Sequence, residues 1–552
     1  MNLARAARLA LILAFLAAGP PLVALGVGHQ LRTPSDPEPP RLHVDTTYVA
    51  PTGRTLAVRA GGDFQAALDA AQPGDVVTLE PGARFTGNFT LPNKRSPGWI
   101  VIRTAAPDSS LPAPDARITP SYACVLPEII SPNSSPALSA APGAHQYRVI
   151  GIEFTVSSAV AVNYGLIVLG NRPTSPGDVP HDLVFDRVYI HGALRLNLRR
   201  GIAMNSAFTA IINSHISDVH ETEADAQAIA GWDGPGPFKI VNNYLEASGE
   251  NLMFGGADPS IRDLVPSDIE IRDNLFSKPL SWRVGDPGYA GTHWPVKNLL
   301  ELKNARRVLI DGNLFENNWA DAQGGTAIVI TVRNQDGGAP WSVVEDVTFS
   351  NNIVRHTGAG VGLGGMDSHP SQGTRRVLIE NNLFVDVSGA RWGGGGRLFQ
   401  AYNQVTDLVI EHNTAFQDGP IIMTEGRPNP GLVYRDNLSP HNDYGILGTG
   451  TGPGAPTLGA YFPGAGVERN VMIGHHRYAS RYPARNFFPP SLTAVGFVDH
   501  ARRDYRLSDA SPYKRAGSDG KDVGVDFRAL TAAMAAAKTT ELIAGCPRED
   551  NR

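Results

Sequence analysis

The stretch VLIDGNLFENN, residues 308–318, is one of six near-copies of a single motif. Each copy is a short run of alternating β-branched or apolar residues, then an asparagine, then mostly apolar residues. The other five are FKIVNNYLEAS (238–248), IEIRDNLFSKP (269–279), VTFSNNIVRHT (347–357), VLIENNLFVDV (377–387) and LVIEHNTAFQD (408–418). Six copies in one chain cannot be six catalytic sites, so we interpret the motif as an architectural unit.

The spacing of the motif's asparagines predicts a repeat fold. Successive intervals are 31, 39, 39, 30, 31 and 24 residues. A period near 30 residues, with strands in each unit and no helical periodicity, is typical of a β-solenoid. The asparagines are Asn243, Asn274, Asn313, Asn352, Asn382, Asn413 and Asn437.

An asparagine suits the corner between two strands for two reasons. It tolerates the left-handed backbone that a sharp turn requires. Its amide can also hydrogen-bond to the next coil, so that stacked asparagines form an internal ladder. A weaker copy, AIINSHISD (210–218), places His215 at the same position. We therefore expect the asparagines to be stacked on one another at one corner of the coils.

Both ends of the repeat carry segments that fit capping elements. GDFQAALDAAQPGD (62–75) has apolar residues at helical spacing and can cover the open end of the first coil. At the other end, ALTAAMAAAKTTELIAG (529–545) predicts a short closing helix. We place the β-helix at residues 51–440 and the C-terminal coils and capping segment at residues 441–552.

The chain resembles right-handed parallel β-helix proteins of the pectate-lyase-like superfamily over roughly residues 60–527. The resemblance rests on FQAALDAAQPGDVVTLEPGARFTG (64–87), on the recurrent I-x-x-N-x-F coils and on DYRLSDASPYKRAGSDGKDVG (504–524). It implies an all-β, right-handed parallel β-helix. It implies no single activity, because the superfamily hosts lyases, hydrolases, epimerases and non-enzymatic surface proteins. The polygalacturonase pattern (NTD, a DD pair, GHG, RIK) is not present in the sequence.

The charge composition limits the kinds of molecule that the protein is expected to bind. The chain has 48 Lys and Arg against 53 Asp and Glu, a formal charge of −5, and no basic block. Nucleic-acid binding therefore has no electrostatic support. We expect a monomer whose partner is a polysaccharide.

The N-terminus has the pattern of an export signal. Arg5 and Arg8 precede the apolar run Leu9–Ala18, which predicts a signal peptide or N-terminal anchor over residues 1–28. Residues 29–50 form a Pro-rich linker, and no second membrane span is expected. We thus expect a secreted or cell-envelope protein. The two cysteines, Cys124 and Cys546, fit either one long-range disulfide or two separate thiols.

A second family of strands begins apolar and ends in polar residues, which would stack into one column. Neighbouring coils lie about 4.8 Å apart, so several coils would present a long groove that suits an extended polymer. The column contains Asn171, Asn205, Trp232, Asp233, Asp258, Lys303, Asn304, Arg333, Asn334, Asp367, Tyr402, Asn403, Glu425 and Arg427.

Lys303 and Arg333 are the strongest functional candidates in this column. They would occupy equivalent places on adjacent coils, where like charges are unfavourable unless an anion binds them. The alternative is that they pair with Glu301 or Asp336. Four residues are the catalytic candidates: Lys303, Arg333, Asp233 and Asp258.

Clustered acidic residues suggest a cation site upstream. HETEADAQ (220–227) contains three carboxylates, and Glu250 opens the next strand. Hard cations such as Ca²⁺ bind clustered carboxylates, so Asp225 and Glu250 are the candidate ligands. The alternative is a solvated acidic turn.

Two long loops, residues 278–298 and 333–343, interrupt the repeat and are rich in aromatic residues. Insertions in solenoids gather on the binding face. We expect Trp282 and Trp294 to be exposed beside the groove as carbohydrate platforms. The remaining substrate-binding candidates are Trp232, Glu301, Asp367 and Tyr402.

Three kinds of function remain open at this level. In a lyase acting on a uronic-acid polymer by β-elimination, one cation would neutralise the carboxylate and the other would take the C5 proton. Arginine is a poor base, so Lys303 is the better candidate. A glycoside hydrolase or epimerase would use the carboxylates of Asp233 and Asp258. A glycan-binding or surface-structural protein would only hold the polymer.

Overall fold

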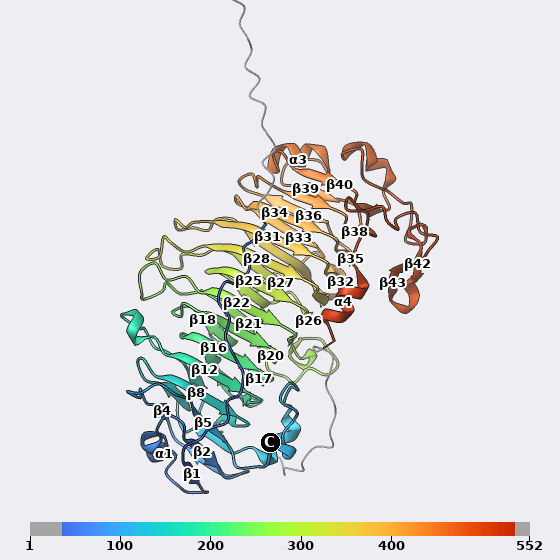
Figure 1. The fold of residues 1–552 in the computed structure, drawn as a ribbon. Coiled ribbons are helices and arrows are strands. Elements are labelled where there is room, and N and C mark those ends of the chain that lie inside the picture. Colours follow the sequence, from blue (N-terminus) through green and yellow to red (C-terminus); the bar gives the residue numbers. More distant parts are fainter. Residues whose placement is uncertain (1–35, 536–552) are drawn as a thin grey trace, which may run out of the picture. The chain divides into compact units, whose positions relative to one another are not determined.

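A computed structural model describes residues 36–535, which lie in one compact unit. The backbone winds into coils, and most coils add one strand to each of three long parallel sheets (Figure 1). The protein is therefore a right-handed parallel β-helix, as the repeat predicts. We call the sheets A, B and C.

Sheet A has 14 strands. In spatial order they are β1 (Thr55–Val58), β2 (Val76–Leu79), β5 (Ile100–Thr104), β8 (His145–Ile150), β12 (His181–Asp186), β16 (Ala207–Ile212), β19 (Phe238–Val241), β22 (Ser267–Arg272), β25 (Ala305–Asp311), β28 (Val344–Ser350), β31 (Thr374–Glu380), β34 (Thr406–Glu411), β37 (Val433–Arg435) and β40 (Gly466–Glu468).

Sheet B has 13 strands. They are β3 (Arg84–Thr86), β6 (Glu128–Ser131), β9 (Glu153–Val156), β13 (Tyr189–His191), β17 (His215–Val219), β20 (Tyr244–Ala247), β23 (Leu275–Ser277), β26 (Leu314–Asn318), β29 (Ile353–Thr357), β32 (Leu383–Val387), β35 (Thr414–Gln417), β38 (Leu438–Pro440) and β41 (Val471–Ile473).

Sheet C has 12 strands. They are β4 (Phe89–Leu91), β7 (Leu138–Ala140), β11 (Ile167–Val168), β15 (Arg200–Ala203), β18 (Gln227–Gly231), β21 (Glu250–Phe254), β24 (Asn298–Leu302), β27 (Thr326–Thr331), β30 (Ala359–Gly364), β33 (Phe399–Tyr402), β36 (Ile422–Glu425) and β39 (Ile446–Gly448). Two small sheets pair β10 (Val162–Asn163) with β14 (Asn197–Leu198) and β42 (Phe497–Asp499) with β43 (Asp504–Leu507).

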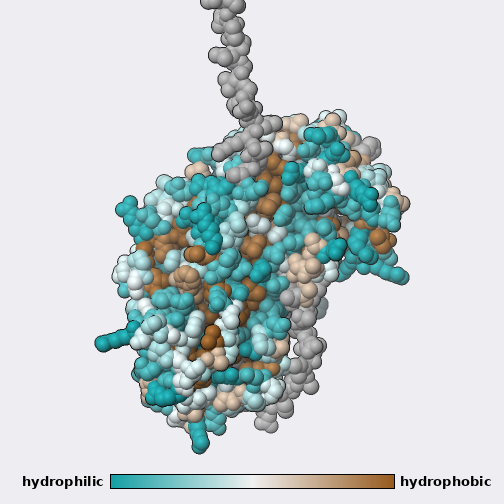
Figure 2. Space-filling model, in the orientation of Figure 1, coloured by the Kyte–Doolittle hydropathy of each residue, from teal (hydrophilic) through white to brown (hydrophobic). Residues whose placement is uncertain are grey.

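The core lies inside the coils and is built by strand alternation. On β25, Val308 and Ile310 point inward, and Ile310 is in register with Ile271 of β22 and Phe349 of β28. Each such buried side chain stabilises the fold by roughly 1.5–3 kcal/mol. The hydrophilic residues on the other side of each strand cover most of the face seen in Figure 2, with hydrophobic atoms in streaks between them.

The predicted asparagine ladder is present. In each step, the backbone N–H and the Nδ2 of one asparagine donate to Oδ1 of the next, for example Asn352 to Asn382 at 2.8 and 3.1 Å. The ladder contains all seven predicted asparagines and continues through Asn470 to Asn486. Upstream, Ser214 donates its N–H to Asn243, so Ser214 and not His215 occupies the ladder position.

The left-handed turn residue is not the ladder asparagine, which corrects our expectation. The residue before it has the positive φ, as at Asn351 (53°) and Asn381 (55°). The turn therefore separates two roles. The left-handed residue reverses the chain and faces outward, and the following asparagine turns inward to bond the next coil. We call the column of left-handed residues the turn column; from the turn after β16 onward it is Asn213, Asn242, Asp273, Gly312, Asn351, Asn381, His412, Asp436 and Arg469.

The N-terminal cap is as predicted. Helix α1 (Phe64–Ala70) begins at Asp63, whose side chain accepts a hydrogen bond from Ala66 N, and it buries Phe64 and Leu68 against the first coil. The far end of the core is covered by α3 (Ala455–Tyr461), which brings Leu458 into the core cluster.

The short C-terminal helix α4 (Phe527–Ala533) does not close the stack. Its Leu530 and Met534 pack against Leu383 of β32, on the outer face of sheet B. The rest of the predicted helix lies outside the described residues, and α2 (Gly389–Trp392) is the remaining α-helix within residues 36–535. The three sheets also continue past residue 440, through β39, β40 and β41.

The part of the expected linker that the structure describes is ordered against the fold. Residues 36–50, which we call the N-terminal strap, cross the outer face of sheet A (the dark blue trace in Figure 1). Glu38 N donates to Asp346 at 3.0 Å and Arg41 N donates to Asp268 at 2.8 Å. Val44 packs in a small apolar cluster with Val184, Ala210 and Ile212. The Pro-rich composition thus reflects an extended docked segment.

Two predictions concern the ends of the chain. The expected signal peptide or anchor, residues 1–28, lies outside the described residues. Cys124, in a 3-10 helix before β6, is disulfide-bonded, whereas Cys546 lies outside the described residues. Among residues 36–535, no helix is long and apolar enough to cross a membrane.

Candidate functional site

A groove of about 600 Å³ lies on the outer face of sheet C. It crosses four neighbouring strands: β24, β27, β30 and β33. Five of the predicted site residues meet there: Glu301, Lys303, Arg333, Asp367 and Tyr402. The other lining residues are Gln323, Thr326, Val329, Thr331, Gly362, Met366, Ser368, Gln400 and Asn403.

The two predicted cations lie on adjacent coils. Leu302 pairs with Ile330, and Arg333 N donates to the Lys303 carbonyl at 2.8 Å. Lys303 and Arg333 thus lie on adjacent coils, and both line the groove.

Each cation has its own carboxylate. Lys303 Nζ lies 3.4 Å from Glu301 Oε1, which was one of the predicted partners. Arg333 Nε lies 3.3 Å from Asp367 Oδ2, so Asp367 and not Asp336 is the partner of Arg333. The Arg333 and Asp367 side chains keep 41% and 33% of their exposure, so this pair is open to an anionic ligand.

Glu301 connects the groove to a buried polar column along the start of the neighbouring strands. Gln227, Glu250 and Asn298 are in register on β18, β21 and β24. Gln227 Nε2 donates to Glu250 Oε2 at 2.8 Å, and Asn298 Nδ2 donates to Glu301 Oε2 at 3.0 Å. Leu299 and Leu300 both pack in the core, so alternation is interrupted here and Asn298 reaches the same side as Glu301.

The electrostatics of Glu301 differ from those of an exposed carboxylate. Burial raises the pKa of its carboxyl to about 7; Lys303 opposes this shift, whereas the charge of Glu250 and a hydrogen bond shared with it add to it. Burial also raises the pKa of Tyr402, and Asp367 adds to that shift. Tyr402 OH lies 3.4 Å from Thr331 Oγ1, so a protonated phenol faces the groove.

Asp225, the other predicted metal ligand, already contacts a cation. Lys297 Nζ lies 2.5 Å from Asp225 Oδ2 and 3.8 Å from Glu250 Oε1. Asp225 and Glu250 are thus near each other, as predicted, with an ammonium between them. Three buried oxygens of the column have no hydrogen-bond partner among the described residues: Gln227 Oε1, Glu250 Oε1 and Asn298 Oδ1.

The two carboxylates that we expected to act as a pair are bound to loops. Asp233 is buried and accepts hydrogen bonds from the backbone N–H of Ser260 at 2.5 Å and from its hydroxyl at 3.0 Å. Asp258 accepts from the backbone of Asp336 at 3.2 Å and of Gly338 at 2.7 Å. Neither residue lines the groove. Their contacts hold the loops beside sheet C, so the structure gives no support to this pair as an acid and base.

The expected exposure of Trp282 and Trp294 is wrong. Both are 2% exposed and pack together with Trp319 in a satellite cluster. His220 stacks on Trp294, with ring centroids 3.8 Å apart. The long loop 278–298 therefore needs its tryptophans as its own core. Trp232 is half-buried, with the Arg200 guanidinium 5.0 Å from its ring centroid, and it does not line the groove.

Several site residues were missed from sequence. Gln227 and Asn298 begin their strands and Lys297 precedes one, whereas the column predicted from sequence consists of polar residues at strand ends. Aligning the strands VKNLLELKN (296–304) and SGENLMFGG (248–256) would have brought Asn298 into register with Glu250. Gln400 lies between Phe399 and Ala401 of β33, where strand alternation alone predicts an outward side chain.

The fold defines the class of the protein as a right-handed parallel β-helix. No protein-family model matches the chain, and no curated protein does.

Solved structures with a similar fold include a mannuronic-acid-specific polysaccharide family 6 lyase from human gut microbiota. The TM-score is 0.47 and the identity 12%, over 79% of this chain and 92% of that chain. The family 6 alginate lyase AlyGC gives 0.43 and 13%, over 86% and 58%. An α-1,3-glucanase of family GH87 from Streptomyces thermodiastaticus gives 0.43 and 14%, over 77% and 70%. Likenesses at this level do not assign an activity to this chain.

Proposed function

We propose that the sheet C groove binds an extended acidic polysaccharide and cleaves it by β-elimination. One observation carries the proposal: Lys303 and Arg333 lie on adjacent coils and both line an open groove. Two cations so placed can hold one anionic sugar unit between them. The neighbouring strands provide a surface on which further sugar units can lie.

The proposed steps use side chains that line the groove. Arg333 exchanges its exposed partner Asp367 for the uronate carboxylate and neutralises it, which makes the C5 proton more acidic. Lys303 first gives a proton to Glu301 and then, as the neutral amine, takes the C5 proton. The electron pair forms the C4–C5 double bond, and the C4–O4 bond breaks. Tyr402, with its pKa raised by burial, donates a proton to the leaving oxygen.

We also propose that calcium binds at the column beside the groove. Gln227, Glu250 and Asn298 would hold it, because each has an oxygen without a hydrogen-bond partner, and such oxygens are the hard ligands that Ca²⁺ prefers. Asp225 would remain bound to Lys297. Bound calcium would add positive charge beside Glu301, which lines the groove.

The geometry favours this chemistry over hydrolysis. Asp233 and Asp258, the carboxylate pair considered for hydrolysis, do not line the groove. A protein that only binds the polymer would use the same groove. The experiment below distinguishes such binding from cleavage.

The test is to incubate purified protein with alginate, polygalacturonate and a neutral glucan. Ultraviolet absorbance of the unsaturated product and new reducing ends are measured together. Cleavage of an acidic polymer with both signals supports elimination. Reducing ends without absorbance would show hydrolysis, and binding without either signal would show a glycan-binding protein.

Substitutions in the groove test whether the reaction takes place there. Arg333→Ala and Lys303→Ala should each lower the rate by about 100-fold or more, because each removes a group that acts only in the reaction. Arg355→Ala is the matched control, since its side chain is 39% exposed and pairs with Glu316 on sheet B. Equal losses in Arg355→Ala and Arg333→Ala would refute the groove assignment.

We further propose that the protein is exported and acts as a monomer outside the cytoplasm. The support is the Arg5, Arg8 and Leu9–Ala18 pattern, which lies outside the described residues. Cell fractionation and size-exclusion chromatography of the recovered protein test this. Recovery in the cytosol, or elution as a larger species, would contradict the respective part of the proposal.

A further inference from the structure

A second cluster of polar side chains lies far from the groove, where the C-terminal segment docks on the last coils. It contains one imidazole and two carboxylates. His412 Nε2 lies 3.4 Å from Asp519 Oδ2 and 3.7 Å from Asp436 Oδ2. One ligand atom from each residue falls within 4.8 Å of the other two. This is the one such group of three found among residues 36–535.

The fold places these residues by two independent routes. His412 and Asp436 are neighbours in the turn column, so the coil spacing fixes their separation. Asp519 comes from the segment that follows β43 and runs back over the turn column. Ser518 anchors that segment, because its N–H and its hydroxyl both donate to Asp436, at 2.7 and 2.5 Å.

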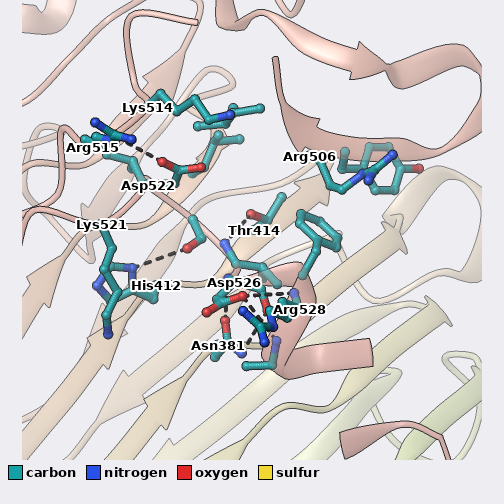
Figure 3. Close-up of a pocket in the computed structure, with 18 of the residues that line it drawn as sticks. Asn381, His412, Thr414, Arg506, Lys514, Arg515, Lys521, Asp522, Asp526 and Arg528 are labelled. Carbon is teal, nitrogen blue, oxygen red and sulfur yellow. Dashed lines mark hydrogen bonds between the residues drawn. The ribbon is translucent and has the colours of Figure 1, made fainter. Parts of the chain in front are cut away.

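A hydrogen bond on the far side of the His412 ring orients the imidazole toward the two carboxylates. His412 Nδ1 lies 3.3 Å from the Gly524 carbonyl (dashed line at His412 in Figure 3), so Nδ1 carries the proton that this bond requires. In the neutral imidazole, Nε2 is then the acceptor nitrogen, and it faces Asp436 and Asp519. Metal-bound histidines are held in this way, with the second ring nitrogen donating to a carbonyl or carboxylate.

We propose that His412, Asp436 and Asp519 bind a divalent transition-metal cation of the Zn²⁺ class. Ligands at about 2.0–2.1 Å from a tetrahedral centre are roughly 3.3–3.4 Å apart, which matches the His412–Asp519 distance and is near the His412–Asp436 distance. An imidazole with two carboxylates suits zinc, whereas Ca²⁺ takes oxygen ligands. His412 also lines a pocket of about 1020 Å³, which leaves room for water as a fourth ligand.

The metal would fasten the C-terminal segment to the coils. Two ligands belong to consecutive coils and the third to the docked segment, so one ion joins three stretches of chain. Lys521 Nζ lies 3.1 Å from Asp519 Oδ2 and Lys521 also lines the pocket. Its ammonium competes with the cation for that carboxylate, and a bound metal displaces it into the pocket.

The experiment is calorimetric titration of the untagged full chain with Zn²⁺ after removal of metals by a chelator. It is run under non-reducing conditions, which keep Cys124 in its disulfide. We expect one equivalent to bind, the melting temperature to rise, and cleavage of the segment 516–526 by an added protease to slow. Ca²⁺ at the same concentration should not reproduce these effects.

Substitutions separate a metal site from an ion-pair cluster. His412→Ala and Asp519→Asn should weaken Zn²⁺ binding by about 100-fold or more, because each removes one of three ligands. Lys521→Met should tighten it by about threefold or more, because a competing positive charge is lost. Asp509→Asn is the control, since Asp509 lies in the same segment and pairs with Lys514.

Three results would overturn the proposal. One is the absence of Zn²⁺ binding by the metal-free chain. Another is unchanged binding in the double variant His412→Ala with Asp519→Asn. The third is destabilisation by Lys521→Met with no gain in Zn²⁺ affinity, which would show that the cluster is a network of ion pairs.

Discussion

Arg333 and Asp367 form an ion pair at the open side of the groove, with Nε and Oδ2 3.3 Å apart. Because both side chains remain partly exposed, the pair contributes about 1 kcal/mol or less to stability. Its position in the groove means that Asp367 competes with any anion that approaches Arg333.

Asp367→Asn should therefore raise the affinity for acidic oligosaccharides, by about threefold or more, since a competing negative charge is removed. The melting temperature should change little. Calorimetric titration with uronate oligomers measures the effect. Glu316→Gln, which frees Arg355 on sheet B in the same way, should leave affinity unchanged. A loss of affinity in Asp367→Asn would mean that Asp367 itself contacts the sugar.

The asparagine ladder predicts two very different effects at neighbouring positions. Asn352 is fully buried; it donates to Asn382 and Ile310, and its Oδ1 accepts two hydrogen bonds from Asn313. Asn352→Ala should lower the free energy of unfolding by about 2–4 kcal/mol, because buried donors lose their acceptor. Asn351 has φ 53°, so Asn351→Gly should cost less than about 1 kcal/mol. Denaturant unfolding compares the two, and equal losses would contradict the division of roles.

Lys278 should be a structural lysine. Its ammonium is buried and donates to the carbonyls of Ala247, Ser248 and Gly249 and to Asn251. Lys278→Met should lower the free energy of unfolding by about 3 kcal/mol or more, because these acceptors lose their donor. Lys94→Met is the control, since Lys94 bonds two helix-end carbonyls that water can reach.

The same lysine predicts a pH dependence. Burial lowers the pKa of Lys278 to about 7, against 10.5 for the unfolded chain. Between these values the unfolded chain holds the proton more strongly, so this group makes stability rise as pH increases from about 7 toward 10.5. Melting temperatures across that range should show the rise in the wild-type protein and a weaker one in Lys278→Met. Parallel curves would contradict the assignment.

The N-terminal strap predicts sensitivity to acid. Burial opposes ionisation of Asp268, but hydrogen bonds from Arg307 and from the strap outweigh it, and the pKa of the carboxyl lies below its ordinary value of 3.8. The stability it contributes is present above that value and is lost as pH falls below it. Protease cleavage of the strap should accelerate below pH 3.8.

Asp268→Asn tests this origin. The variant should release the strap already at neutral pH and show little further acid effect, because the hydrogen bond from Arg41 N is weakened and the titrating group is gone. Asp263→Asn, an exposed carboxylate on a loop, is the control. If both variants keep the acid dependence of the wild-type protein, another group releases the strap.

Most of the fold could be predicted from the repeat, because a hydrogen bond between neighbouring coils sets its period. An asparagine that must bond its copy in the next coil cannot drift, so Asn243 to Asn437 marked the corner in every coil. The same reasoning placed Lys303 and Arg333 on adjacent coils. The one-residue error in the left-handed position arose because Asn is common at both places, as in Asn351 and Asn352.

The remainder of the site depends on contacts that periodicity does not encode. Trp282 and Trp294 look like exposed loop residues until the loop folds on itself. Asp233 and Asp258 were expected to face the groove, but nearby backbone N–H groups bind their carboxylates. The Pro-rich composition of residues 36–50 is the same for a free linker and for an extended segment with a partner. A free linker and a docked segment are distinguished only by the contacts that residues 36–50 make with sheet A.

The N-terminal strap should change how the β-helix unfolds. A stack of coils that touch only their neighbours can fray from one end or open in the middle at modest cost. Here Glu38 bonds a residue 308 positions away, and Thr46 accepts from Arg148 of β8. A single segment thus ties an early coil to one far along the stack. We expect the coils that the strap connects to unfold in one cooperative transition. During folding, the strap, which is synthesised first, can dock fully only after the coil that contains Asp346 has formed.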